Sequence, residues 1–160
     1  MELLAHGDLL GTARSVDPPG PAVPRTRRKI VGRVVLDYDA RCLRRRRMQT
    51  EGGAAFMVDL PRTVSLDPGA LLVLDDGCAV EVASAHEPVL RITGDLPRLA
   101  WHIGNRHCPC EIHPDHLVIR ADPVLLDMLT RLGATVTRSL APFRPEGGAY
   151  GHGRTFGHSH

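Results

Sequence analysis

The chain has 160 residues, enough for one ordinary domain or two small ones. Its apolar runs fall short of the roughly 20 residues of a membrane-spanning helix, and its start lacks an export-signal pattern. These features exclude a membrane protein and a secreted disulfide scaffold, so the four cysteines are expected to be free thiols in the cytoplasm.

Charge is spread unevenly along the chain. The formal net charge is +2, but residues 1–47 hold eleven basic and five acidic side chains, whereas the remainder holds nine and thirteen. This asymmetry is compatible with a nucleic-acid face or with a docking surface for an acidic protein, and does not choose between them.

Residues 1–26 are predicted to be a flexible leader. They contain the proline-rich stretch 17–21 and Pro24, with little periodicity after Leu10. Prolines and glycines at this density mark loops rather than packed elements.

Residues 27–85 are predicted to form a small β-sandwich-like domain that docks partners. Its short strands are rich in β-branched residues, and Pro61 is expected to stop the second. Asp75-Asp76-Gly77 predicts a hairpin turn, because glycine accepts the positive φ that such turns require. The expected strands cover residues 30–36, 56–60, 71–74 and 78–82.

Residues 86–146 are predicted to form a ferredoxin-like βαββαβ domain, which makes the whole chain α+β. Apolar residues at near-3.6 spacing indicate two helices, one starting at Leu96 and one starting after Asp122-Pro123. Asp95 and Asp122 are expected to cap their first turns. Gly104-Asn105 and Gly133 are expected to end them in the left-handed conformation. The expected strands lie at 89–93, 110–112, 117–120 and from 135 onward.

Residues 147–160 are predicted to be a flexible tail that bears His152, His158 and His160. The tail is too rich in glycine to bury a core. Its histidines are not a continuous run, as an affinity tag would be, so metal capture is the preferred interpretation.

A second group of candidate ligands lies between Trp101 and Ile112. His107, beyond the first helix, is the stronger candidate because loops at element ends expose side chains on a rigid base. His102 is a weaker candidate, since a helical histidine is more often structural. Cys108 and Cys110 share one face with Ile112 and are expected to point inward, which leaves Cys110 a weak ligand candidate.

Two other functions are alternatives to metal binding. Residues 44–47 are four consecutive arginines, but with only six aromatic residues in the chain a protein-docking or solvated face is favoured over nucleic acid. A zinc hydrolase using His102, His107 and Cys110 lacks a plausible general base. His113 and His116 span a predicted turn rather than a helix face. The chain is therefore predicted not to be an enzyme.

Two long motifs and the histidine-bearing tail resemble the UreE-type urease accessory proteins, a family of nickel metallochaperones. The motifs are Trp101-His102-Ile103-Gly104-Asn105-Arg106-His107 and the segment from Pro142 to His152. The resemblance covers roughly Lys29 to the C-terminus. It implies an N-terminal peptide-binding-like domain and a ferredoxin-like domain through which members form homodimers.

The resemblance also implies a metal site and partners. His107 would meet its copy in the dimer to hold one Ni(II), and the tail histidines would add ligands or load further ions. The implied partners are a urease accessory GTPase and the urease apoprotein complex. Nickel comes from the resemblance, because imidazole suits Zn(II) and Cu(II) as well. The auxiliary histidines that some members carry are absent from Arg120-Ala121-Asp122-Pro123.

Overall fold

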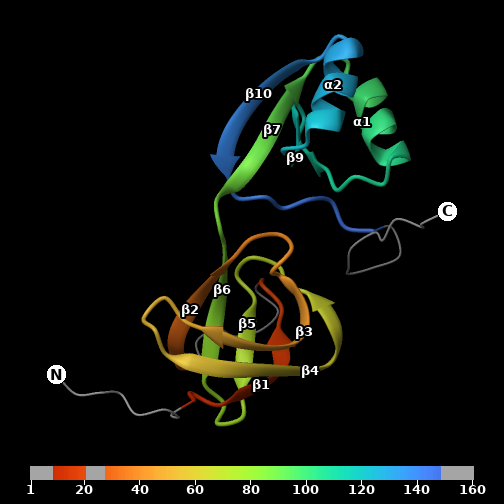
Figure 1. Ribbon diagram of the computed structural model, residues 1–160. Helices are drawn as coiled ribbons and strands as arrows, with labels where there is room; N and C mark the ends of the chain where they lie inside the picture. The colour runs from red at the N-terminus through yellow and green to blue at the C-terminus, as the bar shows by residue number, and fades with distance from the viewer. Residues whose placement is uncertain (1–8, 21–27, 149–160) are drawn as a thin grey trace. The chain divides into compact units, whose positions relative to one another are not determined.

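The computed structural model describes residues 9–20 and 28–148, which form two compact units divided between Ser84 and Ala85. Figure 1 shows the strands of the first unit and the two helices of the second. Among the described residues, no helix is long and apolar enough to cross a membrane.

The first unit is one six-stranded sheet in the order β2-β6-β5-β1-β4-β3. Its inner face encloses a single apolar core to which all six strands contribute, including Ala13, Phe56 and Val80. The predicted β domain is therefore present, as a single curved sheet around one core. The strands are β1 (Thr12–Asp17), β2 (Ile30–Leu36), β3 (Cys42–Gln49), β4 (Ala55–Ser65), β5 (Leu71–Leu74) and β6 (Ala79–Ser84).

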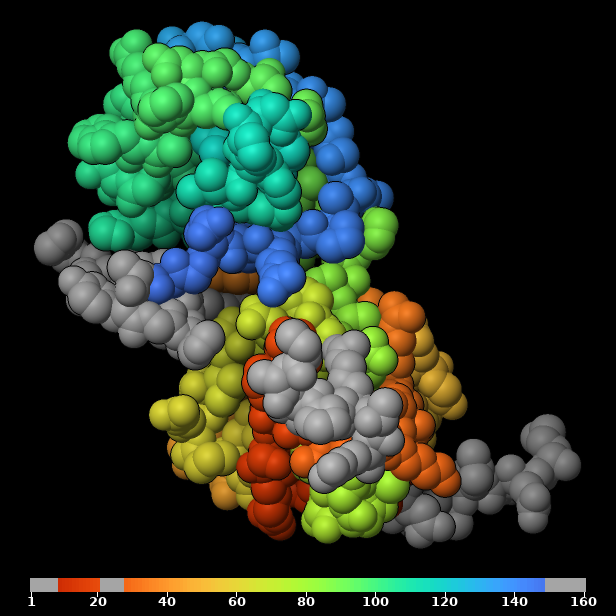
Figure 2. All heavy atoms as spheres, turned by 180° about the vertical axis from the view of Figure 1, so that it is seen from behind, coloured from red at the N-terminus to blue at the C-terminus, as the bar shows by residue number. Residues whose placement is uncertain are grey.

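The prediction of a flexible leader over residues 1–26 is wrong for Thr12–Asp17. These residues form β1, which pairs in parallel with β4 and antiparallel with β5. In Figure 2 the red atoms of β1 lie in the body of the unit and reach its surface. The remaining leader residues, 1–8 and 21–27, lie outside the described residues.

Two further predictions for this unit have clear outcomes. The hairpin at Asp75–Gly77 is confirmed, with Gly77 at φ 85° and its N–H donating to the carbonyl of Leu74. Pro61 does not end its strand, because β4 continues to Ser65. The pairing of β4 with β3 shifts register across this stretch, and proline is tolerated at such irregularities.

The second unit confirms the ferredoxin-like βαββαβ order. Its antiparallel sheet has the order β10-β7-β9-β8. Both helices pack on this sheet through one core that includes Leu99, Ile103, Leu125 and Leu129. The elements are β7 (Glu87–Thr93), α1 (Leu96–Asn105), β8 (Glu111–Ile112), β9 (Leu117–Arg120), α2 (Pro123–Arg131) and β10 (Thr135–Ala141).

The helix ends follow the predictions for α2 and depart from them for α1. Asp122 accepts hydrogen bonds from the N–H groups of Val124 and Leu125, as expected of an N-cap. Asp95 precedes α1 but makes no side-chain cap hydrogen bond. Gly104 and Asn105 belong to α1 itself, and the left-handed residue beyond it is His107, at φ 55°.

Candidate metal centre

His107 occupies the left-handed position of a Schellman motif at the end of α1. Its N–H donates to the carbonyl of Gly104 at 3.0 Å, and the N–H of Cys108 reaches the carbonyl of Ile103 at 3.4 Å. Glycine usually fills this position because a Cβ is disfavoured there. Among the described residues, His107 is the only non-glycine with positive φ, and its side chain is exposed.

His102 lies five residues before His107, within α1, and is half-buried. Its ring meets the ring of Trp101 edge-on, with centroids 5.1 Å apart. Within residues 9–20 and 28–148, no group of three or more His, Cys, Asp or Glu side chains could hold a metal ion. A centre at His107 therefore needs ligands from elsewhere.

Cys108 and Cys110 pack against the apolar core of the second unit, as expected. Burial is the main cause that raises the pKa of both thiols, and the neighbouring Cys108 helps to raise that of Cys110 to about 12. Since the thiolate is the form that binds metals, this environment disfavours Cys110 as a ligand. Ile112 does not follow the cysteines inward as expected: it is 52% exposed, on the edge strand β8.

The segment after β10 is fixed beside β8. Phe143 is fully buried, and Glu111 Oε2 accepts the backbone N–H of Arg144 at 3.2 Å. The N–H of Glu146 donates to the carbonyl of Cys110 at 2.9 Å. Figure 2 shows this blue segment beside the teal hairpin residues. The described chain thus ends close to the residues that follow His107, whereas His152, His158 and His160 lie outside the described residues.

His113 and His116 form a stacked pair in the β8–β9 turn. Their ring centroids are 4.2 Å apart with 9° between the planes. His113 Nε2 lies 2.7 Å from Glu111 Oε1, and His116 Nδ1 lies 2.7 Å from Asp115 Oδ1. Imidazole lone pairs lie in the ring plane, so two parallel stacked rings cannot direct theirs at one ion. As arranged, this pair does not chelate a metal.

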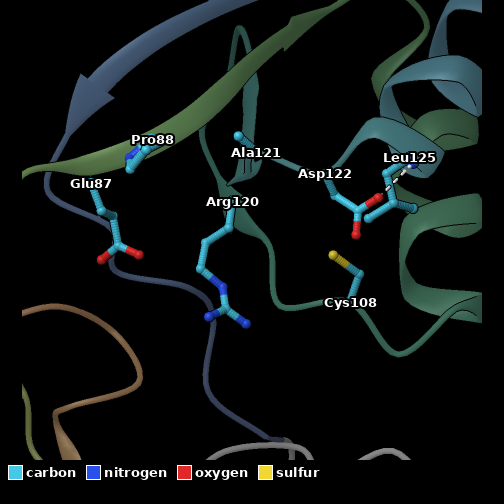
Figure 3. Close-up of a pocket in the computed structure, with 7 residues that line it drawn as sticks. All are labelled: Glu87, Pro88, Cys108, Arg120, Ala121, Asp122 and Leu125. Atoms are coloured by element: carbon cyan, nitrogen blue, oxygen red, sulfur yellow. Dashed lines mark hydrogen bonds between the residues drawn. The ribbon is translucent and has the colours of Figure 1, made fainter.

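A cavity of about 290 Å³ opens beside Cys108. Figure 3 shows the Arg120 guanidinium between the carboxylates of Glu87 and Asp122, with the Cys108 sulfur directed toward Asp122. This mixed lining favours neither a bare cation nor a bare anion. The cavity is lined by Glu87, Pro88, Cys108, Arg120, Ala121, Asp122 and Leu125.

Comparison with known proteins identifies the family. Residues 20–85 match the UreE urease accessory protein N-terminal domain, and residues 87–160 match its C-terminal domain. The urease accessory protein UreE of Rhodobacter capsulatus is 58% identical over 127 residues, covering 79% of this chain and 81% of the relative. The chain belongs to the UreE family.

Two further UreE proteins are similar over nearly the same length. That of Paracoccus denitrificans is 60% identical over 122 residues, covering 76% of this chain and 79% of its own. That of Ruegeria pomeroyi is 54% identical over 129 residues, covering 80% and 87%. UreE proteins are accessory chaperones rather than enzymes, so the chain acts in urease maturation together with its machinery.

Sequence reasoning missed two features of this UreE site. One is the backbone conformation of His107, because Gly104-Asn105 offered a more conventional place for the helix to end. The other is Glu111, whose two oxygens join the β8–β9 turn to the C-terminal segment. The alternation of side chains along a strand predicts that Glu111 points away from the cysteines. No local sequence pattern predicts its hydrogen bond to Arg144, 33 residues further along the chain.

Proposed function

We propose that two copies of this chain bind one Ni(II) between them through His107 of each subunit, and deliver it to the urease apoprotein through a urease accessory GTPase. Histidines of the C-terminal tail, His152, His158 and His160, add ligands or load further ions. The observation that carries the proposal is an exposed histidine in the left-handed position that ends α1.

The conformation of His107 supports a role for its side chain. A residue with a Cβ costs roughly 1–2 kcal/mol in the left-handed region, and glycine would avoid that cost. Strained positions of this kind concentrate at functional sites. The Schellman hydrogen bonds and the burial of Ile103 hold the backbone rigidly, so the imidazole projects from a fixed base.

Exposed apolar residues of the second unit support a homodimer. Trp101 is 64% exposed on the same helix that ends before His107. Covering so large an apolar side chain favours association. In a two-fold symmetric interface, a residue near the axis meets its own copy. An interface over the end of α1 would therefore bring two His107 side chains together.

Chain length supports a contribution from the tail. Glu146 is bound to Cys110, and three residues from Cys110 to His107 span at most about 11 Å. The six residues from Glu146 to His152 extend to about 20 Å. Chain length therefore allows His152 to reach the ion proposed at His107.

A site with few imidazole ligands suits transfer better than storage. Affinity for divalent ions rises from nickel to copper along the Irving–Williams order, so the ligands alone do not select Ni(II). Zn(II) and Cu(II) are expected to bind in vitro, and selection falls to geometry and to the partner. A centre that is shared between subunits and completed by a tail opens without unfolding either domain.

Equilibrium dialysis against Ni(II), with the oligomeric state measured by light scattering, tests the proposal. His107→Ala should remain dimeric and lose the tightest nickel site, with an affinity at least about 100-fold weaker. The matched control His86→Ala replaces an exposed histidine of the same unit and should bind normally. A His107→Ala variant that keeps the tightest site per dimer would show that the assignment is wrong.

A further inference from the structure

Strand β3 forms one edge of the sheet in the first unit. It pairs with β4 on one side, and within the described residues no strand pairs with its other side. After the end of β3, the N–H of Glu51 donates a hydrogen bond to the carbonyl of Arg33 in β2. An edge strand presents unpaired N–H and C=O groups, so β3 offers backbone pairing to another extended chain.

The same edge carries positive charge that the unit does not neutralise. Residues 44–47 are four consecutive exposed arginines. Arg45 pairs with Asp59 at 2.8 Å, and Arg14 approaches the same carboxylate at 3.2 Å. Arg44 and Arg46 instead donate to backbone carbonyls. Within the part of the chain that the structure describes, no carboxylate pairs with Arg44, Arg46 or Arg47.

The surroundings of this edge favour protein over nucleic acid as the partner. Binding of single-stranded nucleic acid combines positive charge with exposed aromatic rings on which bases stack. Tyr38 and Phe56 of this unit are 6% and 0% exposed, and its exposed large apolar residues, Leu9, Ile30 and Val35, are aliphatic. Pairing along an open strand edge is, moreover, a way of binding polypeptides.

We propose that the β3 edge binds an extended acidic segment of a partner protein. The segment adds a strand beside β3 and places carboxylates against Arg44, Arg46 and Arg47 on both faces of the sheet, because Arg46 pairs with the buried Val58 whereas Arg47 pairs with Met57 on the opposite face. Backbone pairing supplies affinity, and the three guanidinium groups supply the preference for acidic sequence. The proposal does not involve metal binding at His107, so it can be tested separately from the proposed nickel site.

Fluorescence anisotropy of the full-length protein with a labelled glutamate-rich peptide, which presents carboxylates on both faces of an added strand, tests the proposal. Replacing Arg44, Arg46 and Arg47 together by serine should weaken binding by about tenfold, since exposed charge pairs contribute modestly each. Replacing the same three residues by lysine keeps the charge and should restore most of the binding. Circular dichroism and thermal unfolding establish that each variant is folded.

A charge-matched control removes the same number of positive charges from the second unit. Serine replaces three exposed residues there, and peptide affinity should change by less than about twofold. An equal loss in this control would mean that overall charge, not the β3 edge, attracts the peptide. The residues are Arg98, Arg131 and Arg138.

Two altered probes separate the remaining explanations. A peptide with N-methylated backbone amides should bind much more weakly, and undiminished binding would overturn strand addition. A single-stranded oligonucleotide should bind less tightly than the acidic peptide near physiological ionic strength. Tighter oligonucleotide binding that depends on Arg44, Arg46 and Arg47 would overturn the protein partner. If neither probe distinguishes wild type from the serine variant, the arginines only guard an exposed sheet edge.

Discussion

The two helices of the second unit end in the same motif but with different residues. In α2 the left-handed position belongs to Gly133, whose N–H reaches the carbonyl of Thr130, while Ala134 N–H reaches Leu129. In α1 the equivalent position belongs to His107. Since both turns have the same backbone hydrogen bonds, stability alone does not require histidine. The comparison shows that α1, unlike α2, carries an exposed side chain at the left-handed position that ends the helix.

The largest expected effect separates function from stability at the end of α1. Replacing His107 by glycine should weaken the tightest nickel site at least about 100-fold, because the imidazole is lost. The same substitution should raise the free energy of unfolding by only about 0.5–1 kcal/mol, because glycine avoids the left-handed cost but loses more backbone entropy on folding. Nickel titration and urea denaturation of the metal-free protein measure the two effects. A variant that is both less stable and nickel-competent would break the comparison.

The reciprocal change at the end of α2 should cost stability only. No atom lies within 4 Å of a Cβ added to Gly133, so Gly133→Ala introduces backbone strain without a clash. We expect the free energy of unfolding to fall by about 1–2 kcal/mol. Nickel affinity should be unchanged, because Gly133 belongs to the other helix. Urea denaturation checks the first result, and altered nickel binding would contradict the second.

The helix starts provide a smaller contrast. Asp122→Ala removes two hydrogen bonds to backbone N–H groups and should destabilise the protein by about 1 kcal/mol, whereas Asp122→Ser should recover most of that loss. Asp95→Ala removes no cap hydrogen bond and should stay within about 0.5 kcal/mol of wild type. Thermal unfolding distinguishes them, and equal losses would mean that the two helix starts are equivalent.

The smallest expected effect concerns the thiol of Cys110. The pKa of Cys110 is raised to about 12 in the folded chain, so an unfolded chain deprotonates first as pH rises. The contribution of this thiol to the free energy of unfolding is fully present below the ordinary thiol pKa. It is lost progressively as the pH rises from there toward the folded pKa of about 12. We expect a loss below about 1 kcal/mol up to roughly pH 9.5. In pH-dependent denaturation Cys110→Ala should lose stability less steeply than wild type and keep only the contribution of Cys108, whose pKa is also raised by burial. An identical slope would refute the assignment.

Sequence reasoning succeeded where structure is set by near neighbours. The Asp122-Pro123 start, Gly133 and the Asp75–Gly77 hairpin each depend on residues a few positions apart. It failed for β1, whose Thr12–Asp17 segment has little apolar pattern and becomes a strand by pairing with β4 and β5. The arginines of β3 likewise became strand residues through pairing with β4. A local sequence pattern does not reveal pairing between strands that are far apart in the sequence.

For the candidate site, the sequence indicated which residue but not how it is held. The sequence favours His107 over His102 because His107 lies beyond a helix, and the structure places its side chain in solvent. The left-handed backbone and the fastening of Arg144 to Glu111 were not predictable, because the first contradicts residue preference and the second joins distant segments. The ligands from the tail and from a second subunit remain predictions.

The chain contains a single tryptophan, and its position makes the protein its own optical reporter. Trp101 is 64% exposed on α1, edge-on to His102 and six residues before His107. Its emission therefore depends on solvent contact at the surface proposed for dimerisation. A paramagnetic ion bound nearby would also quench it. Subunit association and metal loading thus act on the same indole, and titrations in protein and in metal separate the two signals without any added label.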